Sequence, residues 1–178
     1  MRNICFAILL LSLLSCEKEK FPNVTNDGIN TFGMRINGVE WTPDVKTFFN
    51  GKIKPKAVFF PNNSTLMLEA VGDGECFFSV TINGLGRYYF NKSFSPYVKE
   101  TDQVWDPILY RTRYSLLTQH YILHDSLESN ITITRFDTIN KIVSGIFSLR
   151  LEDSIKHEVK EITEGRFDLV YYREENEI

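Results

Sequence analysis

The stretch NITITRFDTINKIVSGIFSLRL, residues 130–151, decides the fold class. In its second half, Phe147, Leu149 and Leu151 alternate with polar residues. A period of two is typical of a β-strand with one buried face and one face in water. Two such runs on either side of the polar turn at 137–141 predict an antiparallel hairpin with a wet outer face.

The same pattern continues on both sides of this hairpin, at intervals of about ten residues. Asn37-Gly38 favours a type I′ hairpin turn, and runs at 65–71 and 76–82 flank a Gly-Asp-Gly turn. One buried face is expected to carry Cys76, Phe78, Val80 and Ile82, and another Phe167, Leu169 and Tyr171. We expect Gly145 and Gly165 to mark bulges or bends. About ten strands predict a single all-β domain, an antiparallel β-sandwich or flattened β-barrel.

The N-terminus has the layout of a secretion signal. Its apolar run, residues 4–14, contains Ser12 and is much shorter than the about 20 residues that cross a bilayer as a helix. Arg2 precedes this run and small residues follow it, as in a signal peptide that is cut off after export. We therefore predict a signal peptide at 1–15.

The sequence Leu13-Leu14-Ser15-Cys16 resembles the lipobox of bacterial lipoproteins. The resemblance implies that Cys16 becomes the first residue and carries a diacylglycerol on its thiol. Two alternatives are an ordinary signal peptide that happens to precede Cys16, and a buried N-terminal helix. Residues 16–30 mix charge with Pro, Asn and Gly, so we expect a lipidated flexible tether there and the β domain at 31–178.

Composition limits the possible functions. Removing residues 1–15 takes one of the 20 basic side chains away, which leaves 19 basic against 23 acidic ones, a net charge of −4. No concentrated basic stretch is present, which argues against a nucleic-acid partner. Cys5 leaves with the signal and Cys16 is expected to be acylated, so Cys76 has no partner for a disulfide, and a buried apolar role is expected for it.

No catalytic or cofactor signature is found in the sequence. It contains no G-x-S-x-G, H-E-x-x-H or C-x-x-C motif and no Gly-rich phosphate loop, so no cofactor is predicted. His120 and His124 stand four apart on a predicted strand, which puts them about 13 Å apart and predicts no shared metal ion. Paired carboxylates drawn from Glu69, Asp106 and Asp168 remain a hypothesis for glycoside chemistry.

Two sets of residues are candidate surface sites. The segment 91–107 contains Tyr97 and Trp105, whose rings either stack on a ligand such as a sugar or pin the segment to the core. Three Asp-[Ser/Thr]-aliphatic sequences resemble the acceptor of Bacteroidota O-glycosylation, and ordinary turn chemistry is the alternative for them. The acceptor residues would be Ser126, Thr138 and Ser154.

Most of the chain, from about 30 to 172, resembles a family of small Bacteroidota lipoproteins, a domain of unknown function. The resemblance is carried by FGMRINGVEW at 32–41, ITITRFD at 131–137 with Asn140, SGIFS at 144–148 and TEGRFD at 163–168. It is lost between about 91 and 125. It implies an envelope location and a β fold, and it supplies no catalytic residue.

The function that we expect is therefore that of a lipid-anchored cell-envelope protein, held at the outer membrane through its N-terminal lipid. In the preferred form it is a non-catalytic binding or interaction module for an envelope protein or a glycan. In the alternative it is a glycan-directed envelope hydrolase that uses paired carboxylates.

Overall fold

A computed structural model describes residues 21–43, 54–72, 74–89, 108–112, 120–123, 129–153 and 156–174. The predicted signal peptide and Cys16 lie outside these ranges. So do the candidate residues Tyr97, Trp105, Ser126 and Ser154, together with Asp106 and His124.

The described part of the chain is built from eleven strands and confirms the all-β prediction. Their bounds are β1 Thr31–Ile36, β2 Val39–Trp41, β3 Lys56–Phe60, β4 Thr65–Val71, β5 Gly74–Thr81, β6 Gly86–Tyr89, β7 Ile108–Thr112, β8 His120–Leu123, β9 Asn130–Asp137, β10 Ile142–Asp153 and β11 Val159–Arg173. These ranges contain no helix long and apolar enough to cross a membrane.

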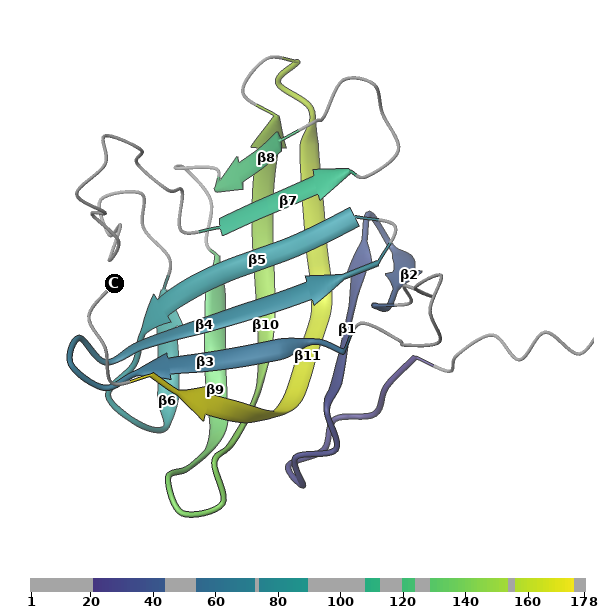
Figure 1. The fold of residues 1–178 in the computed structure, drawn as a ribbon. Helices are drawn as coiled ribbons and strands as arrows, with labels where there is room; N and C mark the ends of the chain where they lie inside the picture. The colour runs from purple at the N-terminus through teal and green to yellow at the C-terminus, as the bar shows by residue number, and fades with distance from the viewer. Residues whose placement is uncertain are drawn as a thin grey trace, which may run out of the picture.

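The strands form two layers whose directions cross (Figure 1). One layer has the order β2-β1-β11-β10-β9-β6, and the other has the order β3-β4-β5-β7-β8. Each layer turns one face inward, so apolar residues at alternate positions of both layers share one core.

The long strands β10 and β11 join the two layers. The end of β10 pairs with β8, through Leu151 to Asp153, and the end of β11 pairs with β3, through Tyr171 to Arg173. The contact between β11 and β3 is parallel, whereas the other described pairings are antiparallel. Long strands that pass from one layer into the next form the corners of an orthogonal sandwich.

Aromatic rings hold the layers together at the centre of the core. Phe78 of β5 lies 5.0 Å from Phe147 of β10, measured between ring centroids, and both rings approach Phe32 of β1. All three side chains are buried. Tilted rings at these separations stabilise a core beyond the area that they bury.

Gly145 and Gly165 make room for two of these rings. Gly145 pairs across the β10–β11 ladder with Phe167, and Phe147 pairs with Gly165. A methyl group on Gly165 would lie 2.5 Å from the Phe147 ring, and one on Gly145 would lie 2.7 Å from Phe167. Each ring therefore covers the glycine opposite it. Register shifts next to both positions confirm the expected bulges.

Other sequence predictions are confirmed by burial and backbone geometry. The residues expected to face inward on β5, β10 and β11 are all buried, including Cys76, and Ile82, just after β5, is buried with them. Asn37 and Gly38 have φ values of 49° and 80°, as a type I′ turn requires. His120 lies on a strand, β8, as expected, and Tyr121 and Leu123 of this strand are buried.

Replacing Gly165 by Ala is expected to destabilise the protein by about 1–3 kcal/mol, because the added methyl group overpacks the core against Phe147. The measurement is the free energy of unfolding in urea. The double variant Gly165→Ala/Phe147→Leu should lose less free energy of unfolding than the two single variants lose together, because the smaller leucine leaves room for the added methyl group.

Ile146→Ala is the matched control, because Ile146 lies next to Phe147 on the neighbouring strand β10 and is 41% exposed on the outer face. Its effect should stay within about 0.5 kcal/mol. Equal effects of Gly165→Ala and Ile146→Ala would contradict the close packing of Phe147 on Gly165.

Candidate functional site

Residues 21–30, here called the strap, lie against the outer face of the layer that contains β1, β11, β10 and β9. The strap has no strand structure of its own, but hydrogen bonds connect it to two of these strands, β11 and β9. This differs from the expectation of a flexible tether over the whole of 16–30. Ordered structure begins at least as early as Phe21.

The carboxylate of Asp168 on β11 is the centre of the strap contact. It accepts hydrogen bonds from Thr25 Oγ1 at 2.7 Å and from Ser144 Oγ on β10 at 2.6 Å. The backbone N–H groups of Asp27, Gly28 and Ile29 donate to it at 2.9, 2.8 and 3.4 Å. Four of the five donors thus come from the strap.

The outward position of Asp168 follows from the alternation of β11, since Phe167 and Leu169 point into the core. The strap covers the side chain, which is only 1% exposed. Burial by itself raises the pKa of this carboxyl group, but the hydrogen bonds from Ser144, Thr25, Gly28 and Asp27 outweigh burial and hold the pKa below its usual value. Asp168 is therefore charged at neutral pH.

Contacts at Phe21, Pro22 and Gly28 also hold the strap on the sheet. The Phe21 ring lies under the guanidinium of Arg166, 4.4 Å from its carbon, and Arg166 also donates to the carbonyl of Pro22. Gly28 has a φ of +73°, and a methyl group there would lie 2.8 Å from Ile142. A glycine is thus required for the strap to lie this close to β10.

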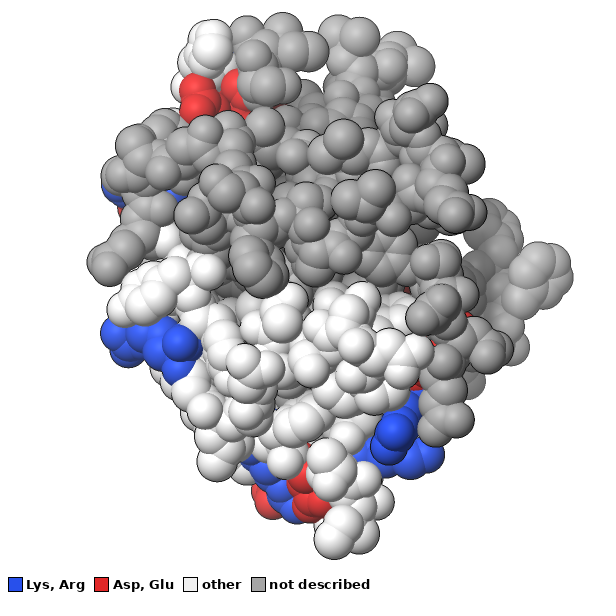
Figure 2. Space-filling view, turned by 90° about the vertical axis from the view of Figure 1, so that its left-hand side faces the viewer, with Lys and Arg blue, Asp and Glu red and all other residues white. Residues whose placement is uncertain are grey.

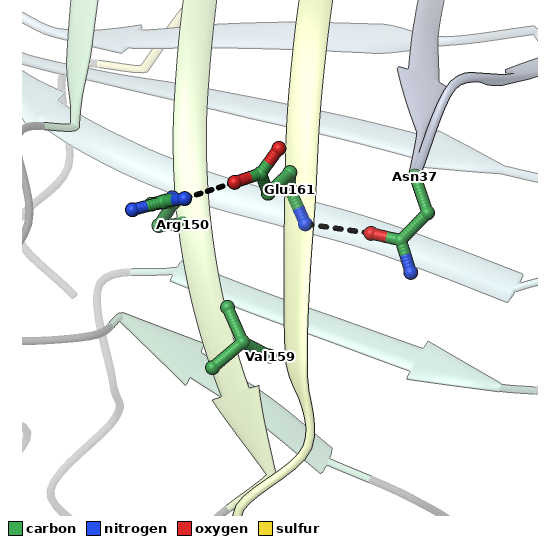
Figure 3. Close-up of a pocket in the computed structure, with 4 residues that line it drawn as sticks. All are labelled: Asn37, Arg150, Val159 and Glu161. Carbon is green, nitrogen blue, oxygen red and sulfur yellow. Dashed lines mark hydrogen bonds and ion pairs between the residues drawn. The ribbon is translucent and has the colours of Figure 1, made fainter.

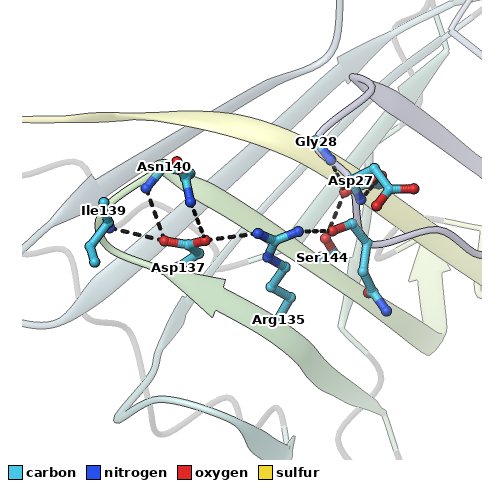
Figure 4. A network of polar contacts seen from close by, with 9 residues as sticks. Asp27, Gly28, Arg135, Asp137, Ile139, Asn140 and Ser144 are labelled. Carbon is cyan, nitrogen blue, oxygen red and sulfur yellow. Dashed lines mark hydrogen bonds and ion pairs between the residues drawn. The ribbon is translucent and has the colours of Figure 1, made fainter.

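A chain of polar contacts continues from the strap to the β9–β10 turn (Figure 4). Arg135 donates to the carbonyl of Asn26 and also pairs with Asp137 at 2.8 Å. Asp137 accepts further hydrogen bonds from the backbone of Ile139 and Asn140 and from the Asn140 side chain. These contacts hold the pKa of Asp137 well below its usual range. Arg135 therefore links the β9–β10 turn to the strap.

A hollow of about 560 Å³ lies elsewhere in the same layer, between Asn37, Arg150, Val159 and Glu161 (Figure 3). Arg150 forms an ion pair with Glu161, and Asn37 accepts a hydrogen bond from the Glu161 backbone at 2.8 Å. A ligand in this hollow would have to compete with the contacts that the polar groups lining the hollow already make with one another. The hollow is therefore a weak candidate site.

A stronger candidate is an uncharged surface, here called the uncharged end, formed by the turns at 61–64 and 82–86 with Tyr88 and Tyr89. Residues 57–68 and 76–86 contain no Asp, Glu, Lys or Arg. The two turns are joined by a hydrogen bond from Ile82 N to Ser64 O at 2.8 Å. The space-filling view of this side shows an uncharged surface of described residues that Lys and Arg side chains border at its edges (Figure 2). Arg87, between Gly86 and Tyr88, is the charged residue next to these turns, and its Nε donates to Thr132 Oγ1 at 3.4 Å.

The uncharged end is held in one conformation while its large side chains stay exposed. Tyr88 donates to the carbonyl of Gly84 at 2.9 Å and accepts from the backbone N–H of Asn83 at 3.0 Å, which fixes the turn at 82–86. Leu85 is 66% exposed and Tyr89 57%. A fixed loop that presents an aromatic and an aliphatic side chain can bind a neutral partner with little loss of entropy.

Of the candidate residues named from the sequence, the structure describes Thr138, Cys76, Glu69 and Asp168, and it places His120 at the start of β8. Thr138 lies in the exposed β9–β10 turn next to Ile139, which is 88% exposed. Cys76 is buried, which raises the pKa of its thiol to about 12 and makes it unreactive as a nucleophile. Within the described ranges no cluster of metal-ligating side chains is present.

Glu69 and Asp168 are not brought together. Asp168 lies outward on β11, beneath the strap. Glu69 lies on β4 between the buried Leu68 and Ala70, so it faces outward from the other layer, 3.8 Å from Lys56. These two carboxylates therefore do not form the pair that the hydrolase hypothesis needs, and Asp106 lies outside the described residues.

Sequence reasoning missed the strap and the uncharged end. One signal for the strap was present: Asp168 interrupts the apolar residues that follow Arg166 in RFDLVYY, and a buried acidic residue needs hydrogen-bond donors from elsewhere. A signal for the uncharged end was the absence of charge from 57–68 and 76–86. Only the tertiary structure shows that turns from these two segments are adjacent.

Comparison of the chain with protein-family models, with curated proteins and with solved structures finds no match.

Asp168→Asn is expected to lower the free energy of unfolding at pH 7 by about 2–4 kcal/mol, because the amide nitrogen cannot accept the hydrogen bonds that a carboxylate oxygen accepts. The folded-state pKa of Asp168 lies below the ordinary value of 3.8. Its charged form therefore stabilises the fold above about pH 4, and this contribution is lost as the pH falls further. The stability difference between wild type and variant should shrink between pH 5 and the acid limit.

The measurement is urea unfolding at a series of pH values, with Glu69→Gln as the control. Glu69 is an exposed carboxylate whose ion pair should contribute less than about 1 kcal/mol. A difference between wild type and Asp168→Asn that stays constant through pH 3 would show that the charge of Asp168 does not hold the strap.

Proposed function

We propose that this protein is a lipid-anchored protein of the bacterial cell envelope, acylated at Cys16, whose β-sandwich is a non-catalytic binding module. The partner would be an envelope protein or a glycan, and the lipid would hold the module at the outer membrane. The sequence supports the anchor through the lipobox-like Leu13-Leu14-Ser15-Cys16 after a short apolar segment. The resemblance to small Bacteroidota lipoproteins supports the same location.

The observation that carries the binding role is the uncharged end. It combines two adjacent turns, a hydrogen-bonded Tyr88 and the exposed side chains of Leu85 and Tyr89. Loops on a rigid sandwich are a common place for binding residues, because the scaffold fixes them and their sequence can vary. The lack of charge favours a neutral surface or a glycan over a strongly charged partner.

The anchor is tested by Cys16→Ala. Two acyl chains bind a bilayer far more strongly than one, at about 0.8 kcal/mol per buried methylene. The wild-type protein should therefore sediment with membranes, and the variant should move almost completely to the supernatant. An intact-mass measurement of the native protein should show the lipid on Cys16, and any further mass would test the glycan hypothesis for Ser126, Thr138 and Ser154.

If Cys16→Ala sediments with membranes as the wild type does, the lipid anchor is wrong. A second cysteine variant serves as control: Cys76→Ala removes a buried thiol and leaves the proposed lipid site unchanged, so it should still sediment with the membrane.

The binding role is tested by placing a photo-crosslinking amino acid at Leu85 in intact cells. We expect a discrete adduct when Leu85 is replaced, and its loss when Tyr89→Ala is combined with the crosslinker. The same crosslinker at Val39, which is 70% exposed in the β1–β2 hairpin, is the matched control and should give no such adduct. A glycan partner is tested separately, by measuring whether the purified protein binds to immobilised envelope glycans.

Identical adducts from Leu85 and Val39, or no adduct together with no glycan binding, would contradict a binding role for the uncharged end.

A further inference from the structure

The strap changes what the lipid anchor can do. A chain that is free from Cys16 to residue 30 would let the domain rotate and move away from the bilayer. The contacts of Asp168, Arg135 and Arg166 instead fix the chain on the domain from Phe21 onward. The length available as a tether is then set by the residues between Cys16 and Phe21.

This length is short. Five residue steps separate Cys16 from Phe21, and a fully extended chain covers at most about 3.6 Å per residue, or about 18 Å in total. A strand of twelve residues, such as β10, is about 40 Å long. The chain between Cys16 and Phe21 can therefore span less than half the length of β10, so a lipid on Cys16 would lie within about 18 Å of Phe21.

The attachment point lies on one outer face. Phe21 contacts Arg35 on β1 and Arg166 on β11. Arg166 points away from the core, since Gly165 and Phe167 on either side of it are packed inward. In Figure 1 the described chain starts, in purple, on the side of β1 and β2 and away from the C-terminal end of β3 and from β6. We call the outer face of β1, β11, β10 and β9, together with the strap, the strap face.

We infer that the strap face is the side of the domain that is held against the lipid bilayer. This inference rests on the proposed acylation of Cys16 and adds the orientation of the domain to it. The outer face of the other layer, formed by β3, β4, β5, β7 and β8, then points away from the membrane.

The exposed aliphatic side chains of the strap face fit a bilayer surface, and the exposed Arg150 and Glu161 of this face are paired with each other. Four large aliphatic residues on or beside the strap are exposed by 40–57%: Val24, Ile29, Ile146 and Val170. Val170 contacts the strap at Gly28 and Asn30, and Ile146 pairs with Arg166 across the β10–β11 ladder. Aliphatic side chains on a face that is already held near the lipid add to the binding by entering the interface.

The test uses a donor fluorophore on one added cysteine and an acceptor lipid in vesicles that carry the acylated full-length protein. Cys76 is buried and the Cys16 thiol carries the lipid, so the added cysteine is the site of labelling. Ile146→Cys reports on the strap face. Glu69→Cys reports on the opposite outer face, where Glu69 is exposed on β4.

Energy transfer from Ile146→Cys is expected to exceed that from Glu69→Cys by at least about twofold, because the two layers are separated by about 10 Å before the outer side chains are counted. Inserting ten Gly/Ser residues between Lys20 and Phe21 leaves the strap docked but adds up to about 35 Å of reach. The ratio of the two signals should then fall to near one.

The matched control is the same insertion directly after Glu174, the last described residue, which adds the same residues without lengthening the segment before Phe21. It should keep the wild-type ratio. Equal transfer from both labels in the acylated wild type would overturn the orientation. A protein without acyl chains would overturn the proposed anchor and the orientation with it, and the intact mass separates these two results.

A second copy of the chain is the other possible occupant of the strap face. If the label at Ile146→Cys is shielded from iodide quenching when no vesicles are present, a protein contact covers this face. That result would also overturn the inference. Quenching that becomes weaker only when vesicles are added is the expected result.

Discussion

The buried carboxylate of Asp168 is the interaction on which the described arrangement of the N-terminal segment depends. A charged group that is 1% exposed needs hydrogen bonds to replace those it made with water. Ser144 supplies one from the neighbouring strand, and the strap supplies the others. Three of the strap donors are backbone N–H groups, those of residues 27–29. The carboxylate therefore fixes the backbone conformation of the strap as well as its place on the sheet. The sheet and the segment before it thus become one folded unit.

A second constraint is the close packing of β10 and β11. Gly145 faces Phe167 and Gly165 faces Phe147, so that each missing side chain leaves room for a ring. The Phe147 ring then reaches Phe78 of the other layer. The same two strands extend past the layer to pair with β8 and β3. Packing between two strands therefore sets how the layers cross, and with it the position of every surface described above.

The strap face and the uncharged end differ in their chemistry and lie at different places on the molecule. The strap face combines exposed aliphatic side chains with the start of the described chain, where a lipid on Cys16 would hold it. The uncharged end lies at the edge where the β3–β4 and β5–β6 turns meet, apart from the strap. An anchored module of this form would keep its neutral turns open to a partner while another face contacts lipid. Neither surface depends on a titrating nucleophile, and the thiol of Cys76 is kept unreactive by burial.

The strands of this protein could be predicted from the sequence because their period of two is a local property. The faces of Phe147, Leu149 and Leu151 on β10, the Asn37-Gly38 turn and the buried Cys76 follow from residues that are adjacent in the chain. The lipobox-like segment is also a local pattern, and acylation of Cys16 stays a prediction. The sequence alone thus determined an all-β domain and its inward-facing residues. Contacts between distant residues were decided only in the tertiary structure: the parallel pairing of β11 with β3, the strap on Asp168 and the joined turns of the uncharged end. Thr25 and Asp168 are 143 residues apart, and no periodicity along a chain can specify which buried carboxylate a distant N–H group will satisfy.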